Sequence, residues 1–180
     1  APEGGHLRDH DVSDTITCAA RTAGNVDCWG PEARRWPRES PPARSIAAPG
    51  PVDHLFVDGD SLCVITIDRA MHCASGVGSD DPTPTWELMA QDVRDSDHGE
   101  GWWCVIAGPA RHVYCGGELR IALPARVLPF DPHRAQAIDG SPVSAQSLAM
   151  GERHVCIILA DSRIACMGDG SGGQLGLGAD

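Results

Sequence analysis

The sequence contains no lysine, few aromatic residues and no long apolar run. All 14 of its basic residues are arginine, and 25 acidic residues give a formal net charge of −11 at pH 7. An acidic chain repels the phosphate backbone of nucleic acids, so nucleic acid is not an expected partner. No apolar run approaches the roughly 20 residues that a membrane-spanning helix needs, so no membrane-spanning segment is expected.

Motifs of common hydrolases and redox sites are also missing. The sequence has no G-x-S-x-G, no H-E-x-x-H and no C-x-x-C. The first two motifs would indicate a serine or a zinc hydrolase, and the third a zinc ribbon or a thioredoxin-like site. We therefore expect a non-catalytic protein without a cofactor or a bound metal.

Eight cysteines form four evenly spaced pairs. Nine residues separate the two cysteines in three of the pairs, and ten residues separate them in the remaining pair. This regularity predicts a disulfide within each pair, and it favours an oxidising, secreted or periplasmic location. The chain begins at Ala1, which fits a cleaved secretory signal, removal of a tag or a proteolytic fragment. The predicted disulfides are Cys18–Cys28, Cys63–Cys73, Cys104–Cys115 and Cys156–Cys166.

The cysteine pairs mark a repeat along the chain. The first cysteines of successive pairs lie 45, 41 and 52 residues apart. Each pair spans two short β-prone runs with a polar or glycine-containing turn between them, which is typical of a β-hairpin. Another run precedes three of the hairpins, at 51–60, 89–100 and 141–152, and supplies a predicted entering strand. Proline-rich stretches between units, such as 34–45 and 79–86, are interpreted as crossing loops.

A repeat of about 45 residues with several short strands predicts a β-propeller. We expect an all-β chain that forms a propeller-like arc of four antiparallel blades, with one hairpin disulfide in each blade. The whole chain, 1–180, is expected to be a single domain with repeats near 12–45, 46–89, 90–141 and 142–180. An arc exposes two sheet faces or edges. A second chain or a second copy completes it, or the four units close on their own.

Residues of the fourth and first units match a known repeat. The first unit has Cys-Trp-Gly at Cys28, Trp29 and Gly30. The matching residues of the fourth unit are Gly151, His154, Cys156, Cys166, Gly168 and 173–178. In these positions the chain resembles the regulator of chromosome condensation family, whose repeat contains His-Thr-Cys, Cys-Trp-Gly and a Gly-Gln-Leu-Gly tail. The resemblance implies a propeller fold, and the cysteine-paired form implies a secreted bacterial type.

Two patterns in the fourth unit have a functional and a structural interpretation. The glycine-rich stretch 171–178 could cradle a phosphate, but it lacks the Lys-Ser/Thr of a phosphate loop. We therefore expect its glycines to supply positive φ angles and close packing between blades. His154 lies near Cys156 as a catalytic base would, but a cysteine in a disulfide is not a nucleophile.

Two further patterns suggest metals. His6 and His10 are spaced to hold a metal ion if they lie on a helix, but a frayed terminus is the preferred interpretation. An acidic segment of the third unit suggests calcium without the spacing of a calcium-binding loop, so a solvated acidic loop is preferred. The acidic residues are Asp92, Asp95, Asp97 and Glu100.

Arginine and tryptophan gather in places where a partner could bind. Both residue types are enriched at binding hot spots, and a proline-rich inter-blade loop brings them together. The predicted binding residues are Arg34, Arg35, Trp36 and Arg38 in that loop, with Trp86, Trp102 and Trp103 elsewhere. Core or blade packing is expected for Trp29. We predict a protein-binding scaffold that presents inter-blade loops to a protein partner or to a second copy. The alternatives are an accessory or inhibitory subunit of an enzyme and a glycan-binding propeller.

Overall fold

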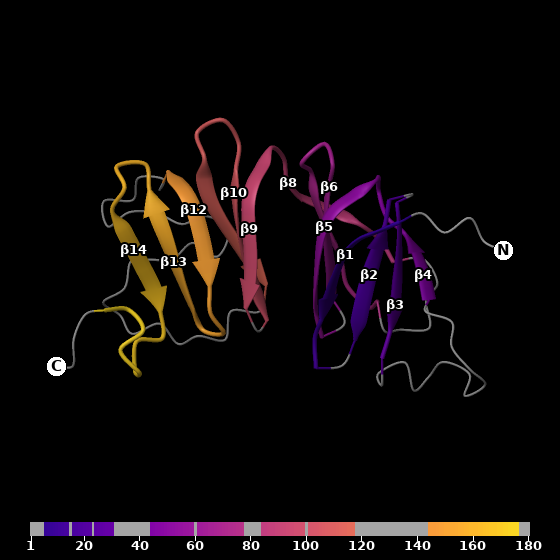
Figure 1. Ribbon diagram of the computed structural model, residues 1–180, viewed down its shortest axis with the longest axis horizontal. Helices are drawn as coiled ribbons and strands as arrows, with labels where there is room; N and C mark the ends of the chain where they lie inside the picture. Colours follow the sequence, from indigo (N-terminus) through magenta and orange to yellow (C-terminus); the bar gives the residue numbers. More distant parts are fainter. Residues whose placement is uncertain are drawn as a thin grey trace. The chain divides into compact units, whose positions relative to one another are not determined.

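The computed structural model describes residues 6–14, 16–22, 24–30, 44–59, 61–77, 84–99, 101–117 and 144–176. These residues contain 14 strands and no helix (Figure 1). They form four antiparallel sheets, each built from strands that follow one another along the chain. The expected all-β, propeller-like fold is therefore confirmed. The chain divides into two compact units, Ala1–Gln91 and Asp92–Asp180, and the repeat boundaries given above stay a prediction.

Unit 1 forms two four-stranded sheets in its described part, which we call blades 1 and 2. Blade 1 consists of β1 (Leu7–Val12), β2 (Thr17–Arg21), β3 (Asn25–Trp29) and β4 (Arg44–Ala47). Blade 2 consists of β5 (Val52–Asp58), β6 (Ser61–Thr66), β7 (Met71–Ala74) and β8 (Glu87–Ala90). Each blade therefore contains the predicted hairpin and an entering strand, followed by an outer strand.

Unit 2 forms two three-stranded sheets in its described part, blades 3 and 4. Blade 3 consists of β9 (Val93–Gly99), β10 (Trp102–Ala107) and β11 (His112–Gly117). Blade 4 consists of β12 (Ala145–Met150), β13 (His154–Leu159) and β14 (Ile164–Gly168). Ser144 forms a single antiparallel bridge with His112, so the residue before β12 extends blade 3 in the place of an outer strand.

The outer strands correct one expectation. The interpretation of 34–45 as a loop is wrong at its end, because β4 begins at Arg44 and pairs with β3. The prolines of this stretch end at Pro42, and the segment Arg44–Ala47 keeps every backbone N–H that a β-ladder needs. Ile46 of β4 lies opposite Val26 and is 1% exposed, so the outer strand contributes to the core of unit 1.

All four predicted disulfides are present, one in each hairpin. The two cysteines of each pair stand directly opposite one another in the antiparallel register. Their Cα atoms are 4.0–4.1 Å apart. Each disulfide closes a loop of about 11 residues, which stabilises the fold by roughly 2.5–3 kcal/mol on the chain-entropy model.

Each blade has a face that carries its disulfide, which we call the cystine face, and an opposite plain face. In unit 1, buried residues of the cystine face of blade 1 pack against the plain face of blade 2. The residues of this core are Ile16, Cys18, Ala20, Val26, Cys28 and Ile46 from blade 1, with Val52, Leu55, Val57, Leu62, Val64 and Val77 from blade 2.

Unit 2 repeats this arrangement. The cystine face of blade 3 packs against the plain face of blade 4. The residues of this core are Trp102, Cys104, Ile106, Val113 and Cys115 from blade 3, with Ala145, Leu148, Val155, Ile157 and Met167 from blade 4. Within each unit, therefore, the disulfide of the first blade lies in the core that joins the two blades.

Candidate functional site

A pair of aspartates joins the blades of unit 1. Asp9 and Asp11 lie on β1, two residues apart, so both carboxylates point from the cystine face of blade 1. Asp9 Oδ2 accepts a hydrogen bond of 2.9 Å from the backbone N–H of Leu55, and Asp11 Oδ2 accepts one of 2.8 Å from Val57. Free N–H groups along a strand edge also repeat every two residues, so the Asp-x-Asp spacing matches the edge of β5.

A second aspartate pair joins the blades of unit 2 in the same way. Asp95 Oδ2 and Asp97 Oδ2 on β9 accept hydrogen bonds of 2.9 and 2.8 Å from the backbone N–H groups of Leu148 and Met150 on β12. The Oδ1 atoms accept further bonds, of 3.0 Å from the N–H of Ser96 and 2.9 Å from that of His98. Each pair thus caps a strand edge that would otherwise expose unpaired donors. We call these pairs the carboxylate clamps.

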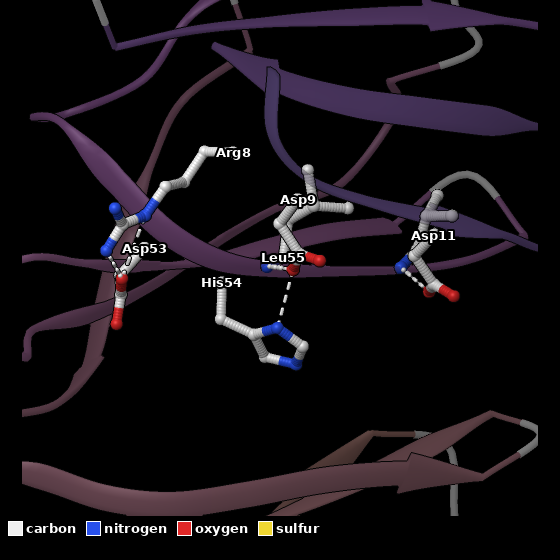
Figure 2. A network of polar contacts seen from close by, with 7 residues as sticks. Arg8, Asp9, Asp11, Asp53, His54 and Leu55 are labelled. Atoms are coloured by element: carbon white, nitrogen blue, oxygen red, sulfur yellow. Dashed lines mark hydrogen bonds and ion pairs between the residues drawn. The ribbon is translucent and has the colours of Figure 1, made fainter. Parts of the chain in front are cut away.

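Polar side chains flank the clamp of unit 1 (Figure 2). The guanidinium of Arg8 forms an ion pair with Asp53, with 2.5 Å between Nη2 and Oδ1. His54 Nδ1 lies 2.5 Å from Asp9 Oδ2, the same oxygen that accepts the N–H of Leu55. These contacts link β1 to β5 along their length, so side chains as well as backbone donors join blades 1 and 2.

The clamps change the interpretation of two sequence patterns. Asp95 and Asp97 do not lie in a solvated acidic loop but in strand β9, with their carboxylates bonded to backbone N–H groups. His10 also lies in a strand, so the helical spacing needed for a metal pair with His6 is not formed. Within the described ranges, no group of three or more His, Cys, Asp or Glu side chains is placed to hold a metal ion. Glu100 lies outside these ranges.

The structure places three of the predicted binding residues. Trp102 is 4% exposed and donates from Nε1 to the carbonyl of Glu152 at 3.0 Å, so it has a packing role in unit 2. Trp103 is half-buried on β10. The indole of Trp86 is also half-buried, and its Nε1 donates to the carbonyl of Ala47 at 3.0 Å. The four loop residues lie outside the described part: Arg34, Arg35, Trp36 and Arg38. A binding role for these seven residues stays a prediction.

Trp29 and the glycine loop can be compared with their expected roles. Trp29 is 42% exposed, so it is not a core residue, and its role in blade packing stays a prediction. Gly173 and Gly176 have φ angles of +83° and +68°, as predicted for the glycine-rich stretch. Close packing also needs a glycine at Gly99, where a Cβ atom would lie 2.6 Å from the carbonyl oxygen of Gly151.

One cystine face differs from the others. The residues two positions inside each disulfide are Ala20 and Val26 in blade 1, Ile65 and Met71 in blade 2, and Ile106 and Val113 in blade 3, and these are 0–6% exposed. In blade 4 the same positions are Ile158 and Ile164, which are 40% and 71% exposed. Ile158 and Ile164 stand opposite one another beside the half-buried Cys156–Cys166 disulfide. Blade 4 therefore presents an apolar cystine face to solvent.

Solved structures share this fold at low sequence identity. Yeast RCC1 (Prp20), solved bound to Kap60, matches 100% of this chain with a TM-score of 0.63 and 15% identity, and the chain covers 47% of it. The fold is that of a β-propeller. The CRINKLY WD40 ectodomain of the Arabidopsis thaliana receptor kinase ACR4 matches 91% of the chain, with a TM-score of 0.50 and 16% identity, and is 50% covered. The computationally designed Ika4 protein matches 93%, with a TM-score of 0.51 and 12% identity, and is 95% covered.

These comparisons establish the propeller fold alone. The chain spans about half the length of the two natural propellers. No model of a known protein family matches the sequence, and no curated protein matches it. Among the residues that the structure describes, no helix is long and apolar enough to cross a membrane.

Proposed function

We propose that the protein is a secreted or periplasmic scaffold, built from propeller repeats like those of the regulator of chromosome condensation family, that binds another protein and catalyses no reaction. The observation that carries this proposal is the set of four hairpin disulfides, which leaves no cysteine free. Disulfides persist in oxidising compartments and are rare in reducing ones. Use of every cysteine in this way favours an extracytoplasmic protein.

The mechanism of such a scaffold is presentation of a rigid surface. The disulfides hold each hairpin in register, and the carboxylate clamps hold the two blades of each unit together. Ordering loops and side chains on binding costs free energy, and a preorganised framework lowers that cost. The segment with Arg34, Arg35, Trp36 and Arg38, predicted from the sequence as an inter-blade loop, is the first candidate contact surface to test. Prp20 was solved in complex with Kap60, which supports a protein-binding use of this fold.

Quantitative affinity capture tests this function. The oxidised chain is immobilised and exposed to the extracytoplasmic proteins of its source organism, beside a variant with alanine at Arg34, Arg35, Trp36 and Arg38. We expect saturable binding of a defined protein that the loop variant loses and that the exposed Arg163→Ala variant keeps. Absence of any saturable protein ligand would contradict the scaffold function. Saccharide-dependent quenching of tryptophan fluorescence would instead favour glycan binding, for which the exposed indole of Trp29 offers a stacking surface.

A further inference from the structure

Each unit covers only one of its two disulfides. The core of unit 1 contains Cys18 and Cys28 of blade 1, and the core of unit 2 contains Cys104 and Cys115 of blade 3. These four cysteines are 0–2% exposed. The disulfides of blades 2 and 4 lie on the face of the blade opposite to the face that packs in the core. Access of a reagent to these two disulfides therefore does not require the two blades of a unit to separate.

The residue beside the disulfide distinguishes blade 4 from the other three blades. In every blade the entering strand places one residue directly opposite the first cysteine, and its side chain lies on the cystine face. This neighbour is Asp11 in blade 1, Phe56 in blade 2, Asp97 in blade 3 and Ala149 in blade 4. Phe56 is 3% exposed, whereas Ala149 is exposed and its side chain is a single methyl group. The entering strand β12 therefore leaves the flank of Cys156 open.

The burial of the cysteines agrees with the open flank. Cys156 and Cys166 are both half-buried, whereas in blade 2 only Cys73 is half-buried and Cys63 is 4% exposed beside Phe56. The rate of thiol–disulfide exchange depends on the access of a thiolate to a disulfide sulfur. Of the four disulfides, Cys156–Cys166 is therefore the one that a thiolate can attack from either sulfur.

We propose that Cys156–Cys166 is a thiol–disulfide exchange site whose co-reactant is a dithiol, and that the other three disulfides are structural. A thiolate of the dithiol attacks one sulfur of the pair, the Cys156–Cys166 S–S bond breaks, and a mixed disulfide forms. The second thiol of the dithiol then attacks the mixed disulfide, and the dithiol leaves as a disulfide. Two electrons and two protons thus pass from the dithiol to Cys156 and Cys166. This inference goes beyond the proposed function, because protein binding needs no covalent step.

Blade 4 keeps its strand pairing when this bond breaks. The ladder between β13 and β14 runs from His154 opposite Gly168 to Ile158 opposite Ile164, and β13 also pairs with β12. The plain face of the blade stays in the core of unit 2. The two thiols therefore remain opposite one another, on Cα atoms that are 4.0 Å apart in the oxidised chain, so an oxidant can form the bond again. Exchange at this site is thus reversible in the folded protein.

Timed reduction of the oxidised, full 180-residue chain tests the site, with dithiothreitol as the dithiol. Samples are quenched with iodoacetamide, and peptide mass spectrometry measures the labelling of all eight cysteines, so the other three disulfides serve as internal controls. We expect Cys156 and Cys166 to be labelled together, roughly 10-fold faster than any other pair, while circular dichroism stays that of the folded chain. Labelling of all four pairs at one rate, or faster labelling of another pair, overturns the inference.

Substitution of the open neighbour tests why this disulfide reacts. Ala149→Phe supplies the cover that Phe56 gives to the disulfide of blade 2, and Ala47→Phe is the matched control, because Ala47 is also an exposed alanine on a strand. Ala149→Phe should slow the labelling of Cys156 and Cys166 by roughly 3–10-fold, and Ala47→Phe should leave it unchanged. Ala149→Leu should give a smaller decrease and replaces Ala149→Phe if that chain does not fold. A folded Ala149 variant that is reduced as fast as the wild type overturns the assignment.

Discussion

Blades 1 and 2 are joined by Asp9 and Asp11, and blades 3 and 4 by Asp95 and Asp97, with hydrogen bonds of 2.9 and 2.8 Å in both units. The surroundings of the two clamps differ. In unit 1, Arg8 reaches across to Asp53 on the next blade, whereas Arg94, its counterpart in unit 2, bonds to Asp92 at 2.8 Å. The clamp is thus the common element of the blade contact, and the flanking ion pairs vary.

Removal of a disulfide should give the largest difference in unfolding free energy between the two units. Cys18 and Cys28 are both 0% exposed in the core of unit 1, whereas Cys156 and Cys166 are half-buried in blade 4. The Cys18→Ala/Cys28→Ala variant should lose about 3–5 kcal/mol of unfolding free energy, because it loses the cross-link and buried packing. Cys156→Ala/Cys166→Ala should lose about 2–3 kcal/mol. Urea denaturation of both variants measures the difference, and equal losses would contradict it.

Substitution of the clamp aspartates should have the next largest effect on the free energy of unfolding. Asp11→Ala removes the acceptor of the Val57 N–H, and a buried donor left without an acceptor costs about 1–3 kcal/mol. Val57 is 1% exposed, whereas Met150, which donates to Asp97, is half-buried. Asp97→Ala leaves two donors without their acceptor, the N–H groups of Met150 and His98, but both residues are half-buried and water can reach them, so each lost bond should cost near the lower end of that range. Thermal and urea unfolding of the two variants test the order.

Asparagine substitutions provide the control for the clamps. Asp11→Asn keeps an acceptor oxygen for the Val57 N–H and removes the charge, so it should recover most of the stability that Asp11→Ala loses. Asp97→Asn should recover less, because both oxygens of Asp97 accept N–H groups and the amide offers only one acceptor to Met150 and His98. An Asp11→Asn variant as unstable as Asp11→Ala would show that charge, not edge capping, holds the blades together.

The cysteine spacing predicted the hairpin register, but it carried no information about the clamps. A spacing of nine or ten residues within each pair places the cysteines opposite one another, and the structure has all four disulfides. Asp95 and Asp97 were predicted as a solvated loop because their partners are backbone N–H groups, which have no signature in sequence. The sequence nevertheless contained a signal for the clamps. In blades 1 and 3, but not in blades 2 and 4, the two aspartates of an Asp-x-Asp stand nine and seven residues before the first cysteine.

An arc of four repeats was expected to expose two sheet faces or edges, but the residues that lie exposed on blade 4 were not predicted. Ile158 and Ile164 read as ordinary core residues of a hairpin, and their counterparts Ile106 and Val113 are both 0% exposed. Which apolar residue is covered depends on the neighbouring blade and not on the hairpin itself. The outer strand β4 was missed because the prolines that precede it led to an interpretation of the whole stretch as a loop.

The flanking ion pair of unit 1 should have a small effect on stability. Arg8 and Asp53 are each 51% exposed, so water screens their attraction. A double-mutant cycle with Arg8→Gln and Asp53→Asn should give a coupling energy of about 0.2–1 kcal/mol, measured by urea denaturation. Salt should reduce the coupling further. A coupling energy larger than the unfolding free energy lost in Asp11→Ala would contradict the view that the Arg8–Asp53 pair is accessory.

The smallest expected effect concerns the hairpin turns of blades 2 and 4, where Asp68 and Asp161 stand five residues after the first cysteine. A hydrogen bond from the Thr66 hydroxyl holds the pKa of Asp68 below its usual value of 3.8. The pKa of Asp161 is lowered chiefly by a hydrogen bond from the Arg163 side chain. The backbone N–H and the positive charge of Arg163 lower it further. A carboxylate with a lowered pKa favours the folded state above pH 3.8, and this contribution is lost as the pH falls through the folded-state pKa.

Arg163→Gln separates the two turns. The substitution removes the guanidinium beside Asp161, so the pKa of Asp161 should rise towards 3.8 while that of Asp68 stays where the Thr66 hydroxyl holds it. Carboxyl carbon chemical shifts, followed by NMR through an acid titration, report both groups in one sample. Because both turns are open to solvent, Arg163→Gln should leave the unfolding free energy at neutral pH almost unchanged. A shift of both pKa values on substitution of Arg163 would mean that the two turns sense a common charge.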